Sequence, residues 1–184
     1  MTWQITTTNH KNRNGNKDPA DGVTKTQTIK TLGRLHRAVV PLPFHMSNSH
    51  TGNRWNAIRI RQQNTNKSLI SQLDLLQSLQ RNDYNICLIQ EPYINFRGKT
   101  RANRNWIVIY PDTHQQHPDN TRSVILINAN LSTDSWKQIH LEHPDISALE
   151  LQGQYGMLRI MNIYNDCENN SSLTHLSAYM RDRE

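Results

Sequence analysis

Long apolar stretches and cysteines are both scarce in this sequence, and each scarcity excludes a class of protein. No apolar run approaches the roughly 20 residues that a membrane-spanning helix needs. Residues 1–17, MTWQITTTNHKNRNGNK, lack the apolar segment of a secretory signal. Two cysteines, Cys87 and Cys167, give neither a disulfide framework nor the spacing of a zinc knuckle. We therefore expect no membrane partner and a reducing, intracellular location, the nucleus included.

The hydrophobic content is also low for a chain of this length. Only 35% of the 184 residues are hydrophobic, and the mean hydropathy is −0.79. The length has room for one domain, or for one domain with a tail. Because apolar side chains are too few to build a core along the whole chain, we expect the second arrangement.

Basic residues are concentrated in the N-terminal third. Residues 1–60 contain nine Lys and Arg residues against two acidic ones, whereas residues 61–184 contain twelve against thirteen. The net charge of +6 and the isoelectric point of about 9.5 therefore belong to the first third of the chain. A basic tail can hold polyanions through counterion release, or it can be a solvated arm.

Residues 1–56 have the composition of a mostly disordered tail. They are rich in Thr, Asn, Lys and Gly, and their one apolar cluster, residues 39–44, is interrupted by Pro41 and Pro43. So little apolar surface cannot offset the conformational entropy that folding would cost. We expect a basic, polar tail over residues 1–56 and a folded domain over residues 57–184.

The domain opens with the pattern of a strand, a helix and a second strand. Residues 57–64, AIRIRQQN, alternate as a half-buried strand does, and residues 86–90, ICLIQ, suit a strand covered on both faces. Between them, Asn66 or Ser68 can cap a helix that closes near residue 82. Its predicted apolar stripe consists of Leu69, Ile70, Leu73, Leu76 and Leu79. The pattern predicts a right-handed βαβ unit.

Further strands and a last helix follow. Strands are predicted at residues 106–110, 122–128 and 145–151 and from Gly156 to Tyr164, with a hairpin-like connection over residues 113–121. The final segment, residues 171–184, has Ser171 or Ser172 as a helix cap and an apolar side. A βαβ unit followed by a run of strands indicates an α/β or α+β layered fold.

Polar side chains stand where three predicted strands end. Asn64 ends the first strand, Glu91 follows the second, and Tyr164 ends the last. Parallel strands deliver side chains from their carboxyl ends into one crevice, so we expect Asn64 and Glu91 at the same sheet edge. Pro92 keeps Glu91 out of the right-handed helical conformation and helps to aim its carboxylate. The three groups suit Mg²⁺, which prefers oxygen ligands and keeps several waters.

Each of these residues also has an ordinary structural interpretation. Glu91 could be a loop carboxylate that pairs with a cation of the basic loop that follows it. Asn64 could begin the helix as a cap or an Asx-turn, and the sequence supports both roles equally. Tyr164 could be a strand-end tyrosine that packs its ring and exposes its hydroxyl.

A basic loop follows Glu91. The segment RGKTRANR places four cations within eight residues, namely Arg97, Lys99, Arg101 and Arg104. Such a loop could hold DNA phosphates while Phe96 or Trp106 stacks on a base. Because basic loops are common and the net charge around this one is near zero, a solvated loop is the somewhat more favoured alternative.

Two histidine pairs, His114 with His117 and His140 with His143, have a spacing that occurs in metal sites. Neither pair has cysteine partners, and each includes or abuts a proline. We expect surface histidines rather than zinc ligands.

The order of the sequence blocks resembles that of the endonuclease/exonuclease/phosphatase superfamily. The blocks are QQNTNKS, DYNICLIQEPY, RSVILIN, ALEL and LRIMNIYND, of which IQEP is the most specific. The chain looks most like the apurinic-endonuclease-like domain of non-LTR retrotransposons, over about residues 57–182. The resemblance implies a four-layer sandwich, with two sheets packed face to face and helices outside.

The resemblance also implies an activity and its residues. It implies Mg²⁺-dependent hydrolysis of a DNA phosphodiester, the nick that primes reverse transcription, with DNA and a reverse transcriptase as partners. Glu91 would bind the metal, Asn64 would lie near it, and Tyr164 would contact the scissile phosphate. Arg122 matches a common basic position of the retrotransposon proteins.

Two blocks of the superfamily do not occur in this sequence. The GDFN-like block and the terminal SDH block, which position the nucleophile and supply the essential histidine, are absent, and Cys167 stands where apurinic enzymes have an asparagine. The sequence thus resembles an N-terminal half, truncated at its C-terminus. We expect an exposed apolar sheet face and little nuclease activity from this chain alone, with the missing half as a possible partner. The alternatives are a non-catalytic nucleic-acid-binding remnant and a phosphatase of the same superfamily.

Overall fold

The computed structural model describes residues 2–9, 23–30, 35–47, 54–79, 84–153, 156–166 and 168–182, with side chains described from residue 57 onward. The strands are β1 Thr2–Asn9, β2 Val23–Lys30, β3 Leu35–Ser47, β4 Arg54–Asn64, β5 Ile86–Gln90, β6 Trp106–Ile109, β7 Ser123–Asn128, β8 Trp136–Ile139, β9 Ile146–Gly153 and β10 Gly156–Ile163. The helices are α1 Leu69–Ser78 and α2 Ser171–Arg181, with 3₁₀ turns η1 Asp112–His114, η2 Pro118–Asn120 and η3 Thr133–Ser135.

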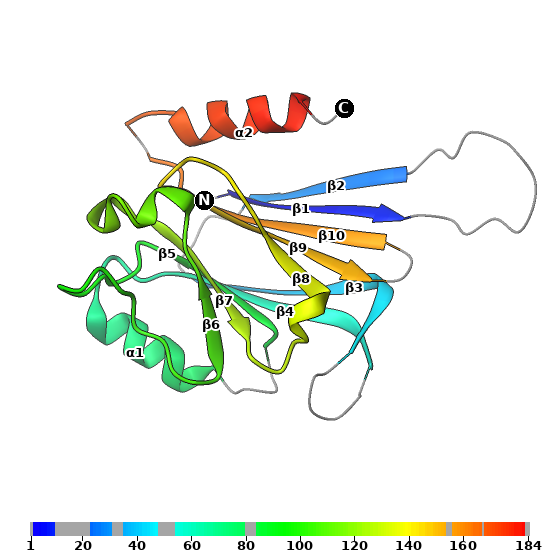
Figure 1. Ribbon diagram of the computed structural model, residues 1–184, viewed down its shortest axis with the longest axis horizontal. Helices are drawn as coiled ribbons and strands as arrows, with labels where there is room; N and C mark the ends of the chain where they lie inside the picture. Colours follow the sequence, from blue (N-terminus) through cyan, green and yellow to red (C-terminus); the bar gives the residue numbers. More distant parts are fainter. Residues whose placement is uncertain are drawn as a thin grey trace, which may run out of the picture.

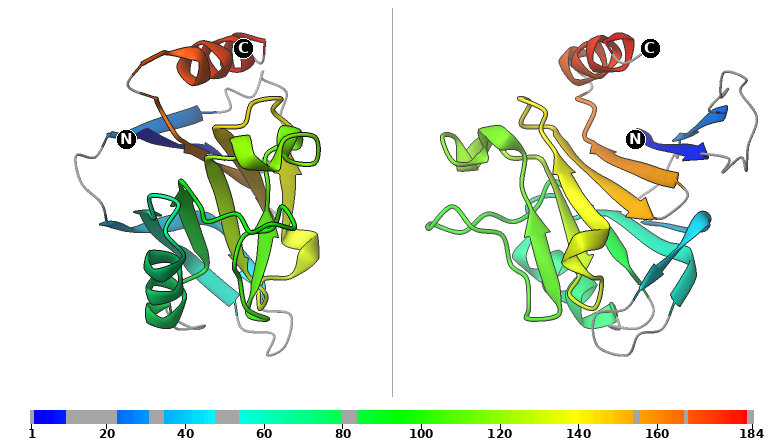
Figure 2. Two further views of the ribbon diagram at one scale, coloured as in Figure 1. Left: turned by 90° about the vertical axis from the view of Figure 1, so that its left-hand side faces the viewer. Right: turned by 45° about the vertical axis from the view of Figure 1, so that its right-hand side comes forward.

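The described strands form two five-stranded sheets (Figure 1). Sheet A has the order β2-β1-β10-β9-β8, and sheet B has the order β3-β4-β5-β7-β6. In the views of Figures 1 and 2, α1 lies beside sheet B and α2 lies on the other side of the molecule, beside sheet A. Two sheets with two helices make this an α+β fold, as the coarse pattern predicts.

The predicted βαβ unit is present in sheet B. Strands β4 and β5 pair in parallel, and the register places Asn64 opposite Gln90. Helix α1 connects them and begins at Ser68, whose hydroxyl accepts a hydrogen bond from the backbone N–H of Ser71 at 3.2 Å. All five residues of β5 are buried, as expected of a strand covered on both faces.

The buried face of α1 differs from the predicted stripe. Leu75, Leu76 and Leu79 are buried against sheet B, whereas Ile70 is 73% exposed and Leu73 is also exposed. Gln72 takes a buried place instead. Both the nitrogen and the oxygen of its side-chain amide have polar partners in the 93–101 loop, which the apolar pattern of the helix cannot reveal.

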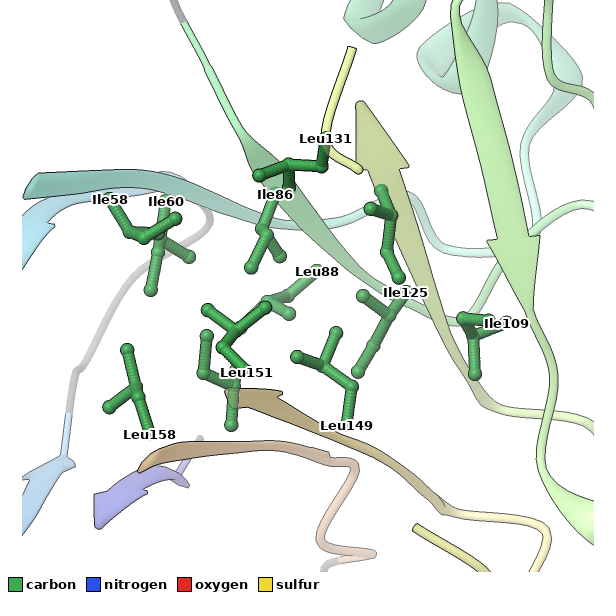
Figure 3. Close-up of a cluster of buried hydrophobic side chains, with 12 residues drawn as sticks. Ile58, Ile60, Ile86, Leu88, Ile109, Ile125, Leu131, Leu149, Leu151 and Leu158 are labelled. Carbon is green, nitrogen blue, oxygen red and sulfur yellow. The ribbon is translucent and has the colours of Figure 1, made fainter. Parts of the chain in front are cut away.

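The main core fills the space between the two sheets (Figure 3). Sheet B contributes buried Ile and Leu side chains from β4, β5 and β7, such as Ile60, Leu88 and Ile125. Leu149 and Leu151 from β9 and Leu158 from β10 meet them from sheet A. The expected exposed apolar sheet face is therefore wrong for this interface, because each sheet covers the inner face of the other.

The N-terminal segment departs from the expected disordered tail. Strand β1 pairs with β10 in sheet A, β2 pairs with β1, and β3 pairs with β4 in sheet B, all antiparallel. The composition argument considered what the segment could bury by itself. It could not foresee that the edges of β10 and β4 offer unpaired backbone groups to any extended segment.

The other predicted strands and the last helix are present in the structure, with small differences in where they begin and end. Strands β6, β7, β9 and β10 are found within two residues of the predicted limits, and β6 and β7 pair antiparallel around the predicted connection. Strand β8, Trp136–Ile139, was not expected, and α2 is capped at Asn170 rather than at a serine. Among the described residues, no helix is both long and apolar enough to cross a membrane.

Candidate functional site

The carboxyl ends of β4 and β5 form a rim with a polar cavity. Asn64 and Glu91 line one hollow of about 500 Å³, together with Thr65, Asn66 and three further polar residues, Gln63, Ser68 and Ser71. The two residues come together because β4 and β5 are parallel neighbours that end at the same level. The predicted convergence of amide and carboxylate is confirmed.

The backbone of Glu91 adopts a left-handed conformation with a φ of +48°. Such a φ costs free energy for a residue other than glycine and persists only where neighbours impose it. Here the N–H of Glu91 donates to the carbonyl of Arg122 at 2.8 Å, and its own carbonyl accepts from the N–H of Lys67 at 2.7 Å and from the hydroxyl of Thr65 at 2.7 Å. Three hydrogen bonds thus fix the peptide that presents the carboxylate.

A polar layer between the sheets brings the end of β10 to this rim. The side-chain amide of Gln90 donates to the carbonyl of Ile163 at 2.6 Å. The amide of Asn162 donates in the other direction, to the carbonyls of Ile89 at 2.8 Å and Val124 at 3.0 Å. Gln90 and Asn162 are both buried, so these bonds form away from water, where leaving them unmade would be costly. They hold the residue after Ile163 next to Glu91.

That residue is Tyr164, and it contacts Glu91 directly. The hydroxyl of Tyr164 donates a hydrogen bond to Oε1 of Glu91 at 3.1 Å. Partial burial and the neighbouring Glu91 carboxylate together raise the pKa of Tyr164 to about 12, so the phenol is protonated at neutral pH. The predicted grouping of Tyr164 with Glu91 is therefore confirmed, although the two belong to different sheets.

Of the two roles that the sequence allows for Asn64, the structure shows the Asx-turn. Its Oδ1 accepts a hydrogen bond from the backbone N–H of Asn66 at 2.7 Å, which is an Asx-turn. Asn66 and Lys67 then both have positive φ, of +51° and +53°. The Asx-turn occupies one lone pair of the amide oxygen, and an amide oxygen has a second lone pair for another partner.

Arg122 forms a charged network beside Tyr164 that the sequence did not indicate. Its guanidinium donates two hydrogen bonds to the carboxylate of Asp145, at 2.7 and 2.8 Å, and one to Asp166 at 2.6 Å. It also lies over the ring of Tyr164, 4.9 Å from the ring centroid. Although partial burial opposes its charge, these hydrogen bonds raise the pKa of Arg122 above its ordinary value. The one available signal was position, because Arg122, Asp145 and Asp166 all stand at strand boundaries.

The basic loop is ordered by its own turn and by α1. The Oδ1 of Asn95 accepts from the backbone N–H groups of Arg97 and Lys99, and Gly98 takes the positive φ that the turn requires. Gln72 of α1 bonds to Tyr93, and it also bonds to the two residues that close the loop, Thr100 and Arg101. The four predicted cations, Arg97, Lys99, Arg101 and Arg104, are exposed.

Two expectations about this loop are corrected. Trp106 is buried in the cluster under α1 and cannot stack on a base, whereas Phe96 is 92% exposed and can. No ion pair within the described residues joins Glu91 to the loop cations, so the salt-bridged interpretation of Glu91 fails.

The rim fits a hard divalent cation that keeps most of its waters. Within the described part of the chain, no three His, Cys, Asp or Glu side chains gather as a metal cluster. Glu91 offers one carboxylate, and only Tyr164 among the described donors bonds to it, which leaves its second oxygen for a ligand. One carboxylate and one amide oxygen in the same lining could hold a largely hydrated cation such as Mg²⁺, whereas a structural zinc site needs four ligands.

None of the four histidines of the two pairs lines the cavity at this rim, and one of them, His114, is not on the surface. His114 is buried, stacks on Tyr110 with 3.8 Å between ring centroids, and bonds through Nδ1 to the hydroxyl of Thr121 at 2.7 Å. Burial lowers its pKa, so the imidazole is neutral at pH 7. His114 is therefore a structural histidine, which corrects the expectation of surface exposure for this residue.

Comparison with protein-family models, with curated proteins and with solved structures found no match for this chain.

Proposed function

We propose that this chain carries one side of the active site of a Mg²⁺-dependent DNA endonuclease of the endonuclease/exonuclease/phosphatase type. The observation that carries the proposal is the hydrogen bond from Tyr164 to Glu91. It joins two polar side chains from the ends of strands in different sheets, at the same rim as Asn64. The order helix, sheet, sheet, helix is in keeping with the four-layer sandwich of that superfamily.

The residues at the rim have distinct roles in this proposal. Glu91 supplies the carboxylate oxygen that binds the cation, and Asn64 supplies an amide oxygen near it. Tyr164 donates to Oε1 of Glu91, which orients the carboxylate and leaves its other oxygen for the cation. A bound Mg²⁺ would polarise a phosphate oxygen and lower the pKa of an attacking water.

Among the described residues that line the cavity at the rim, Glu91 is the one acidic residue and none is a histidine, so no second acid–base group is found there. Besides Glu91, the carboxylates beside Tyr164 are those of Asp145 and Asp166, and both are hydrogen-bonded to the guanidinium of Arg122. A missing general base and missing transition-state donors each cost about two or more orders of magnitude in rate. We therefore expect cation binding with little or no nicking by this chain alone.

Cation binding tests the proposal without depending on activity. Mn²⁺, a spin probe for Mg²⁺ sites, is titrated into the protein and followed by the relaxation of water protons. Glu91→Gln should weaken Mn²⁺ binding by at least about tenfold, because it removes the one carboxylate among the described residues that line this cavity. Tyr164→Phe should weaken it less, since the ligand itself remains.

The matched control is Glu142→Gln, which removes an exposed carboxylate elsewhere. Equal Mn²⁺ binding by the wild type, Glu91→Gln and Glu142→Gln would reject the proposed site. A plasmid-nicking assay with Mg²⁺ then tests completeness. Nicking by the pure chain that disappears in Glu91→Gln would show that the acid–base groups are supplied after all.

A non-catalytic nucleic-acid-binding function is the second candidate, and the exposed basic loop favours it. Phe96 is almost fully exposed, and the guanidinium of Arg97 lies 5.3 Å from its ring centroid. An aromatic ring beside cations suits contact with an unpaired base and its phosphate. This function predicts DNA binding that Glu91→Gln leaves unchanged, in a protein that takes up no Mn²⁺.

A further inference from the structure

A second cavity adjoins the turn that holds Glu91. It has a volume of about 310 Å³ and is lined by Lys67, Asp119, Asn120, Arg122 and Pro144. Two of these residues bond to the backbone of Glu91, since Lys67 donates to its carbonyl and Arg122 accepts from its N–H. The cavity therefore begins at the residues that fix the candidate metal ligand.

The turn that contributes Lys67 is strained in a way that neither β4 nor α1 requires. Asn66 and Lys67 are consecutive residues with φ near +50°, and lysine gains nothing from that conformation. Strain of this kind is retained where the surroundings or a function impose it. Lys67 is exposed, and no ion pair within the described residues occupies its ammonium group.

Arg122 brings a rigid set of donors to the same cavity. Three of its five N–H groups are bound to Asp145 and Asp166, which leaves two for another acceptor. Because Asp145 holds the guanidinium bidentately, little side-chain entropy remains to be lost on binding a ligand. Asn120 adds a side-chain amide to the lining.

We propose that the Lys67–Arg122 cavity is a subsite for a backbone phosphate of nucleic acid, next to the phosphodiester that Glu91 addresses. The subsite rests on the proposed function, because its position matters only if Glu91 lies at the reacting centre. The lining combines an exposed ammonium group, a side-chain amide and a guanidinium that Asp145 and Asp166 hold, and such donors suit phosphate oxygens. A volume of about 310 Å³ is sufficient for one phosphate group with its ester oxygens.

Asp119 allows a more specific test of the subsite, because its carboxylate should disfavour phosphate binding in the same cavity. This exposed carboxylate lines the same cavity and would repel a phosphate held by Lys67. Two substitutions at one cavity should therefore act in opposite directions. Lys67→Asn should weaken binding, and Asp119→Asn, which keeps the side-chain shape, should strengthen it.

The experiment measures binding of a short DNA duplex to the full chain by fluorescence anisotropy, in chelator without metal, across a range of salt concentrations. Lys67→Asn should reduce the slope of log affinity against log salt by about one, and to a similar extent for unrelated sequences. Asparagine suits this test because it tolerates a positive φ. Lys67→Arg should restore the slope.

Two remote charges serve as controls. Arg181→Gln removes an exposed cation at the end of α2, and Asp134→Asn removes an exposed acid in η3; neither residue lines the cavity. Screening within about 10 Å at 0.1 M salt should leave the slope unchanged in both. An unchanged slope in Lys67→Asn, an equal change in Arg181→Gln, or no duplex binding by the wild type at low salt would each overturn the subsite.

A second ligand distinguishes the possible sources of phosphate. A 5′-mononucleotide replaces the duplex, and Lys67-dependent binding of the mononucleotide without Lys67-dependent binding of the duplex would overturn the assignment to nucleic acid. The Mn²⁺ titration separates this inference from the proposed function. If Lys67→Asn binds DNA like the wild type while Glu91→Gln still loses Mn²⁺, the subsite fails and the metal-binding function stands.

Discussion

The phenol of Tyr164 is bound to the carboxylate on which the candidate site depends, and its ionisation therefore senses that carboxylate. Burial, the hydrogen bond to Glu91 and the charge of Glu91 all act to keep the phenol protonated. Of these three causes, two belong to a single neighbouring residue. A substitution at Glu91 can therefore separate them from burial.

We expect Glu91→Gln to lower the pKa of Tyr164 from about 12 to a value between 12 and its ordinary value of 10, since burial still opposes the phenolate. Tyrosine labelled with ¹³C at Cζ reports this shift in an alkaline NMR titration, with Tyr164→Phe to assign the signal. Glu142→Gln should leave the pKa of Tyr164 unchanged. A pKa that does not move in Glu91→Gln would show that the hydrogen bond is absent in solution.

Some individual residues of the site could be predicted from the sequence, and others could not. Glu91, Asn64 and Tyr164 could be predicted because each ends a strand, and strand ends follow from local patterning. Gln72 and the partners of Arg122 could not, because their roles are contacts between segments that lie far apart in the chain. Lys67 likewise acquires its position from a turn whose conformation the letters NTNK do not specify.

Among the elements, neighbouring strands of sheet A share a charged cluster. Glu150 of β9 is only 3% exposed and bonds to Arg159 of β10 at 2.8 Å and to Lys137 of β8 at 3.0 Å. Although burial disfavours its charge, hydrogen bonds from Gln152, Arg159 and Lys137 lower the pKa of Glu150 to about 2. The cluster therefore joins three strands through one carboxylate.

The low pKa of Glu150 predicts a loss of stability in acid. Because its folded-state pKa lies below the ordinary value of 4.5, its contribution is fully present above about pH 4.5 and is lost as the pH falls through about 2. We expect Glu150→Gln to lower the free energy of unfolding by on the order of 3 kcal/mol at neutral pH and by progressively less toward pH 2.

Urea denaturation of wild type and variant at a series of pH values measures this difference. Glu142→Gln, which removes an exposed carboxylate, should change stability little at any pH. A difference between Glu150→Gln and wild type that stays constant down to about pH 2 would contradict the depressed pKa.

Most elements with a clear period could be predicted, and the exceptions share a cause. Strand β8 is a four-residue edge strand with one buried side chain, which gives too short a pattern to recognise. Strands β1 and β2 are polar segments, and β1 and β3 form their ladders with β10 and β4, which come much later in the chain or carry the pattern of the domain. Their formation depends on edges presented by distant residues, not on their own periodicity.

At the scale of the whole molecule, Cys87 is a sensor of global unfolding. It is buried in the cluster between α1 and sheet B, and burial raises the pKa of its thiol to about 12, although the charge of Arg61 acts in the other direction. The thiolate is the reactive form of cysteine. A reagent can therefore reach Cys87, and its thiol can ionise, only when the structure around it opens.

We expect Cys87 in a Cys167→Ser background to resist thiol reagents in the native protein and to react fully in denaturant. Adding Leu151→Ala, which opens a cavity between the two sheets, should destabilise the fold by about 2 to 5 kcal/mol and accelerate labelling by the corresponding factor. Rapid labelling of the native protein, or labelling that Leu151→Ala does not accelerate, would show that the layer of α1 opens independently of the core.

The pairing of β1 with β10 has a consequence for biosynthesis. Thr2 lies opposite Ile163, so β1 pairs with a strand that is synthesised much later than β1 itself. β1 and β2 can join β10 only after translation has passed it, and until then these two polar strands can pair only with each other. Because β1 and β2 contain few apolar residues, they can stay exposed to water during this time without aggregating.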